Sequence, residues 1–88
     1  MVAVKKLGPN SFAAILSITG LKLTYYKEER KILIEYEPDH TQITLWPGEQ
    51  TFIVFMGTIR GYFHRQTTII DELTQGVISV LQVAGDLQ

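Results

Sequence analysis

Alternation of apolar and polar residues through the middle of the chain most strongly constrains the fold. Leu21 to Lys27 places Leu, Leu and Tyr on one face and Lys, Thr and Tyr on the other, and Lys31 to Glu37 repeats this pattern. A two-residue period is that of a half-buried β-strand. Because a short polar segment, residues 27–30, joins the two runs, we predict a β-hairpin.

Further strand-like runs follow this hairpin. Gln42 to Trp46 is a short run with Ile43 and Leu45 expected to point inward. Thr51 to Met56 is apolar on both faces, which predicts a central strand or one that faces an interface. Ile59 to Arg65 alternates once more, so it is predicted as a strand as well.

The secondary structure of the N-terminal segment is less clearly indicated by its sequence. Val2 to Leu7 is predicted as a first strand, and the run Gly-Pro-Asn at 8–10 ends it. The sequence from Phe12 to Thr19 is compatible with either a short helix or a strand. Ala13 and Ala14 favour a short helix, whereas the Phe, Ile and Thr residues around them favour a strand.

The period changes near the C-terminus, where Thr67 to about Gly85 predicts an amphipathic helix. Its apolar stripe has helical spacing and consists of Ile70, Leu73, Val77, Val80 and Leu81. Thr68 followed by Asp71 is a capping signal for the helix start. Gly76 weakens the helix but allows close packing against a sheet.

Together these elements predict a single small α+β domain over residues 1–88. Its architecture would be a mostly antiparallel meander of four to six strands, with one C-terminal amphipathic helix packed on a face. Because one helix cannot cover a broad sheet, the opposite face should be polar or serve as an interface.

Composition narrows the possible functions. The 88 residues are 45% hydrophobic but only 19% charged, which indicates exposed apolar surface suited to a partner or to self-association. The net charge of −1 does not favour binding to nucleic acid or anionic membrane. No cysteine is present, so disulfides, cysteine metal sites and thiol nucleophiles are excluded, and a reducing cytoplasm is the expected location. No apolar run reaches membrane-spanning length.

The densest group of chemically active side chains lies on the strand predicted at residues 59–65. Arg60, Tyr62 and His64 would project from one side of it, followed by Arg65. Cations beside an aromatic ring suit single-stranded nucleic acid or an anionic ligand, because the cations meet phosphate and the ring stacks on a base. The alternative is an ordinary solvated strand face. Gly57 and Gly61 have the spacing of a motif of membrane helices, whose meaning does not apply within a predicted strand.

Exposed aromatic residues are the second candidate surface. Tyr26, Trp46 and Tyr62 are predicted on the sheet face away from the core, where large aromatic side chains anchor protein partners. The alternative is that the N-terminal segment covers them.

Other candidates for chemistry give no site. Glu37, Asp39 and His40 lack the spacing of metal ligands. Glu35 is expected to pair with Lys22 or Lys27 on the neighbouring strand. We therefore expect a protein without catalytic activity, cofactor or metal, whose role is a protein–protein interaction or assembly module, such as a homodimer. The alternative function is weak binding of nucleic acid or an anionic ligand through residues 59–65.

Overall fold

The computed structural model describes residues 2–87, so Met1 and Gln88 at the ends of the predicted domain lie outside it. An antiparallel sheet of five strands precedes two helices. The elements are β1 (Val4–Gly8), β2 (Ser11–Ala14), β3 (Leu21–Tyr26), β4 (Lys31–Tyr36), β5 (Thr41–Leu45), α1 (Phe52–Phe63) and α2 (Thr67–Ala84), with a 3₁₀ turn at Glu37–Asp39. The strand order is β1-β2-β3-β4-β5, which confirms the predicted meander.

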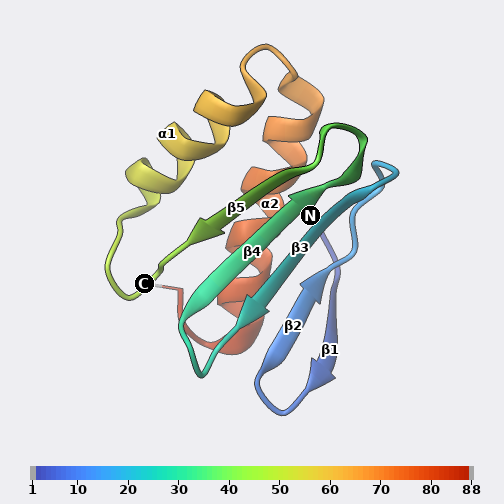
Figure 1. The fold of residues 1–88 in the computed structure, drawn as a ribbon. Coiled ribbons are helices and arrows are strands. Elements are labelled where there is room, and N and C mark those ends of the chain that lie inside the picture. The colour runs from blue at the N-terminus through green and yellow to red at the C-terminus, as the bar shows by residue number, and fades with distance from the viewer. Residues whose placement is uncertain (1, 88) are drawn as a thin grey trace.

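Both helices cover the same face of the sheet, so the molecule has two layers (Figure 1). The predicted hairpin is confirmed, with Leu23 opposite Ile34 and Tyr25 opposite Ile32. These four side chains are buried under the helices, while the residues between them point to the opposite face. Ile43 and Leu45 of β5 are buried as expected. No helix in the part of the chain that the structure describes is long and apolar enough to cross a membrane.

The ambiguous segment 12–19 divides into a strand and a loop. β2 pairs with both β1 and β3, and after Ala14 the chain leaves the sheet. Glu72 of α2 holds this loop, because its carboxylate accepts bonds from the Ser17 amide at 2.5 Å, the Ser17 hydroxyl at 2.6 Å and the Ile18 amide at 3.1 Å. The hydroxyl bond is the main cause that lowers the pKa of Glu72 below its ordinary value.

The predicted C-terminal helix is confirmed as α2, and every member of its predicted apolar stripe is buried. The capping prediction is wrong, because Gln66 is the N-cap residue and makes no side-chain capping bond. Gly85 ends the helix in the left-handed conformation, at φ 79°. Gly76 lies against the sheet: a Cβ there would be 3.1 Å from Leu23 Cδ1, so the predicted close packing is confirmed.

The strands predicted at residues 51–56 and 59–65 are wrong, since most of both segments lies in one helix, α1. The fold therefore has two helices after the sheet, and the prediction of a single helix must be corrected. Thr51 begins α1, because its side chain accepts a bond from the Val54 amide at 3.3 Å. The helix ends where the His64 amide donates to the Arg60 carbonyl at 2.8 Å.

Packing explains why a helix forms here. Phe55, Ile59 and Phe63 recur every four residues, so a helix places all three on one buried face. There the Phe63 ring meets Tyr36 of β4 edge-on, with centroids 5.8 Å apart. Since α2 packs against β1, β2 and β3, the core side chains of β4 and β5 need a second cover. A strand would also turn these three side chains to one face, but it would spread them over about 26 Å instead of about 12 Å.

Candidate functional site

The predicted basic and aromatic surface at residues 59–65 does not form. Arg60 and Tyr62 lie in α1, where residues two apart point about 200° apart around the helix axis. His64 is the C-cap of α1 with φ 47°, and Arg65 follows in the turn to α2. All four side chains are exposed, but they do not share a strand face. The geometry on which nucleic-acid binding was predicted is therefore absent from this segment.

The other two predicted aromatic anchors also lie apart from Tyr62. Tyr26 is half-buried at the end of β3, and the Lys31 ammonium lies 5.5 Å from its ring centroid in a cation–π contact. Trp46 follows β5 and is 38% exposed. It lines a cavity of about 340 Å³ together with Glu28, Glu29, Arg30, Gly48 and Glu49. The three predicted anchors thus do not make a single aromatic surface.

The uncovered sheet face has the mixed character of a solvated surface. Its cross-strand rows join Thr24 to Leu33 and Leu33 to Thr44, and they place Lys22 opposite Glu35. The predicted pairing of Glu35 with Lys22 therefore agrees with the strand register. An opposite-charge pair across strands is stable in contact with water, and the leucine of these rows lies between two threonines. This face has no need of a cover.

The outward face of α1 is different, because it is apolar and exposed. Its members, called here the α1 outer face, are Ile53, Val54, Gly57 and Gly61. Ile53 is 83% exposed, the highest value among the exposed large hydrophobic residues of the described chain, and Val54 is 44% exposed. Arg60 is the single charged residue in the helix. An exposed helix normally carries polar residues on its outer side, and a helix apolar all round is normally buried.

The two glycines make this outer face flat. A Cβ on Gly57 or Gly61 would meet nothing within 4 Å beyond the backbone of the helix, so neither glycine is required by packing within the chain. Each costs the helix about 1 kcal/mol relative to alanine. Glycines four residues apart allow another helix to approach the backbone closely. The two glycines therefore lie one turn apart on a helix, whereas the sequence analysis placed them in a strand.

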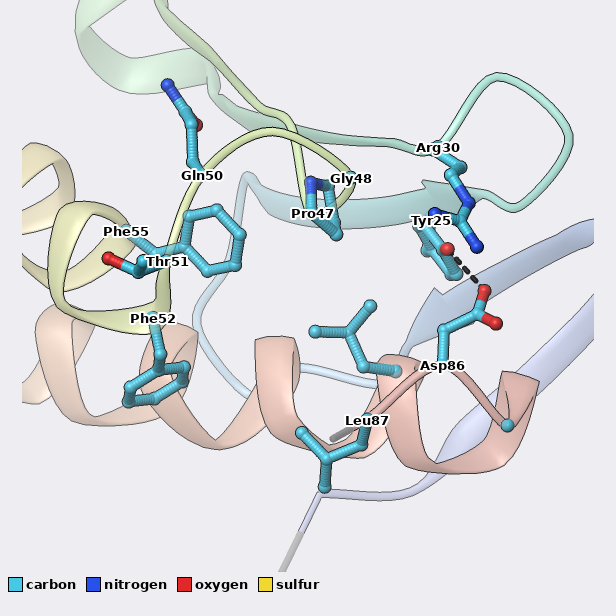
Figure 2. Close-up of a pocket in the computed structure, with 12 residues that line it drawn as sticks. Tyr25, Arg30, Pro47, Gly48, Gln50, Thr51, Phe52, Phe55, Asp86 and Leu87 are labelled. Carbon is cyan, nitrogen blue, oxygen red and sulfur yellow. Dashed lines mark hydrogen bonds between the residues drawn. The ribbon is translucent and has the colours of Figure 1, made fainter.

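A cavity of about 610 Å³ lies beside the residues that follow α2. Figure 2 shows its lining from three segments: β3 and the turn after it, the connection from β5 together with the first turn of α1, and the end of α2 with the residues that follow. Phe55 and Leu81 supply apolar surface, and Arg30 and Asp86 supply charge. This size falls in the range of small-molecule sites, but two of its polar side chains, Tyr25 and Asp86, are bonded to each other.

Tyr25 and Lys27 tie the C-terminal segment to the sheet. The Tyr25 hydroxyl donates to the Asp86 carboxylate at 2.5 Å, as the dashed line in Figure 2 marks. Lys27 lies 3.8 Å from the same carboxylate and donates to the Ala84 carbonyl, so it does not pair with Glu35 as predicted. Burial is the main cause that raises the pKa of Tyr25, and the hydrogen bond and negative charge of Asp86 act in the same direction. These contacts serve attachment of the chain end.

The described residues contain no group of three or more histidine, aspartate or glutamate side chains placed to hold a metal ion. In the segment considered for a metal, Asp39 accepts bonds from the amide of Thr41 at 3.3 Å and its hydroxyl at 2.5 Å. His40 adopts a left-handed conformation at φ 57° beside it. This aspartate stabilises a turn.

Comparison with known proteins adds no identity: no family model, curated protein or solved structure matches the chain. The function must therefore be argued from the surface of the molecule itself.

Sequence reasoning missed Ile53 and Val54 as functional candidates because it assigned them to a strand. A signal for the helix was present in Phe52, Phe55, Ile59 and Phe63, whose spacings of three and four residues are helical. The same segment also fits an apolar strand, and this ambiguity is usual for short apolar runs. Once the helix is recognised, the four residues of the α1 outer face follow from the same period.

Proposed function

We propose that this protein is a non-catalytic interaction module that assembles through the α1 outer face, with a homodimer as the simplest assembly. The observation that carries the proposal is the apolar and exposed surface of α1 around Ile53. Burying apolar surface contributes about 25 cal/mol per Å², so covering this face would stabilise a complex. The cysteine-free composition suits a reducing compartment, and the cytoplasm is the location we propose.

Two further features support assembly over a ligand or catalytic role. The charged fraction of 19% is below the roughly 25% of typical domains, which favours association. No residue of the α1 outer face lines either cavity, and in the larger one the Tyr25 hydroxyl is bonded to Asp86. An interaction surface on α1 would therefore explain the exposed apolar side chains of this helix, which a small-molecule site in either cavity would leave unexplained.

Sedimentation velocity over a concentration series tests this function. The wild-type chain should have the mass of a dimer in the range of tens of micromolar, since small interfaces give weak affinity. Ile53→Glu should be monomeric, because it places a charge on the proposed contact surface. Gln75→Glu is the matched control: it adds the same charge at an exposed position of α2 and should leave the mass unchanged.

Circular dichroism should show both variants folded, because neither side chain belongs to the core. A wild-type chain that stays monomeric at several hundred micromolar would refute assembly through a second copy. A dimer that survives Ile53→Glu would place the interface elsewhere on the molecule.

A further inference from the structure

The cavity of about 610 Å³ has an apolar wall that is partly exposed to water. Phe52 and Leu87 line it and are 39% and 42% exposed, and the buried side chains of Phe55 and Leu81 line it as well. The Phe52 and Phe55 rings meet edge-on, with centroids 6.4 Å apart. Because aromatic rings pack well against one another, this wall suits the flat apolar body of a small molecule.

Arg30 is the one cation among the described residues that line this cavity. Figure 2 shows its side chain extending from the turn after β3 toward the other lining residues. The one ion pair within residues 2–87 joins Lys27 to Asp86, so no carboxylate of this part of the chain lies within 4.0 Å of the guanidinium. Asp86 is the other charged lining residue, and it already accepts the Tyr25 hydroxyl at 2.5 Å. Arg30 can therefore bind an anion in the cavity without first breaking an ion pair.

Two local features hold Arg30 in this place. Its backbone is left-handed at φ 54°, a conformation that favours glycine over arginine. Gly48 has the reverse character: it lies outside the left-handed region, so its backbone does not require glycine. A Cβ at Gly48 would lie 3.2 Å from Arg30 Cδ and 3.5 Å from Nη1. The missing side chain at residue 48 thus leaves the space that the arginine occupies.

From these observations we infer that the cavity binds a small organic monoanion, a carboxylate on an apolar or aromatic body, through Arg30. The planar guanidinium can meet a carboxylate with two parallel hydrogen bonds, while the apolar wall takes the body. A dianion such as a phosphate ester fits less well, because Asp86 adds negative charge to the lining and three glutamates line the smaller cavity beside Arg30. This binding activity does not rest on assembly through the α1 outer face.

Amide NMR titration of the full-length chain with naphthoate tests the inference. The probe should give saturable shifts at Gly48, Thr51 and Leu87, with a Kd of about 1 mM, as expected for a ligand of this size. Naphthylmethanol has the same rings without the charge and should bind about fivefold more weakly, since Arg30 is exposed. This comparison uses the wild-type chain alone, so it does not depend on how a variant folds.

A substitution assigns the charge preference to one residue. Arg30→Gln should weaken naphthoate binding about fivefold and leave naphthylmethanol binding unchanged, because only the carboxylate meets the guanidinium. Arg65→Gln is the matched control: it removes the same charge at an exposed residue that does not line the cavity, and it should bind both probes as the wild type does.

Three results would overturn the inference. The first is the absence of shifts at naphthoate concentrations several times the expected Kd. The second is equal affinity for the two probes, or equal naphthoate affinity in the wild type and Arg30→Gln. The third is a set of shifts centred on Ile53 and Gly57, which would place the probe on the α1 outer face instead of in the cavity.

Discussion

Replacing Tyr25 by phenylalanine tests how the chain end is attached to the sheet. The ring is fully buried, so Tyr25→Phe keeps its packing and removes only the hydroxyl that donates to Asp86 at 2.5 Å. A hydrogen bond to a charged group contributes about 1.5–3 kcal/mol. Because the Asp86 side chain is 18% exposed and lies near Lys27, we expect the low end, about 1.5 kcal/mol.

Urea unfolding followed by circular dichroism measures this loss. Every variant should be compared at one low protein concentration, because dimerisation would add to the apparent stability. A double-mutant cycle with Asp86→Ala should give a coupling energy of about 1 kcal/mol or more between the two side chains. A loss below about 0.5 kcal/mol for Tyr25→Phe, or a coupling energy near zero, would refute the proposed attachment.

The pH dependence of stability gives the same interaction an independent signature. Tyrosine in an unfolded chain titrates near pH 10, whereas in the fold the pKa of Tyr25 is raised. Above about pH 10 the unfolded chain therefore releases a proton that the folded chain retains, and stability falls by up to about 1.4 kcal/mol per pH unit. This part of the slope should be absent from Tyr25→Phe. Equal alkaline slopes in the two proteins would contradict the account.

Four other substitutions test the packing of α2 by the same urea titration. Leu73→Ala should cost about 2–5 kcal/mol because the side chain is fully buried, whereas Gln75→Ala at an exposed position should change stability by less than about 0.5 kcal/mol. Gly76→Ala should not give the usual gain of about 1 kcal/mol, because its methyl group would lie 3.1 Å from Leu23 Cδ1. Glu72→Gln should flatten the loss of stability on acidification below about pH 5, since the pKa of Glu72 is lowered in the fold and its contribution disappears as the carboxylate is protonated. Unchanged acid sensitivity in this variant, or equal costs at residues 73 and 75, would contradict these contacts.

The parts of the fold that were predicted correctly have local signals. The β3–β4 hairpin follows from a two-residue alternation, and β5 follows from inward Ile43 and Leu45. In α2 the apolar stripe is long enough to fix both the type of element and its buried face. Each of these elements carries its own pattern over its whole length, so distant parts of the chain were not needed to identify it.

Residues 52–63 show where local reasoning fails. Phenylalanine, isoleucine and valine favour strands, and Gly57 divides the segment into two runs of strand length. The deciding factor is tertiary: β4 and β5 need a cover that α2 does not supply, and a helix brings Phe55, Ile59 and Phe63 to it together. Such a requirement involves residues distant in sequence and overrides propensity.

The interaction surface that we propose overlaps only one of the segments considered from the sequence. An apolar interaction surface was expected from the low charge and from residues 52–56, and we propose one built largely from this segment. The anchors expected from strand alternation, Tyr26, Trp46 and Tyr62, are instead scattered among β3, the turn after β5 and α1. An error in the type of one element therefore changes which side chains are exposed side by side.

Amide NMR spectra recorded over a dilution series test the central claim most directly, because they report association and its location together. Between about 500 and 10 µM, the account predicts concentration-dependent shifts at Ile53, Gly57 and Gly61, while Thr24 and Thr44 on the uncovered sheet face remain unchanged. Shifts centred on the sheet face, or spectra that do not change with concentration, would contradict assembly through the α1 outer face.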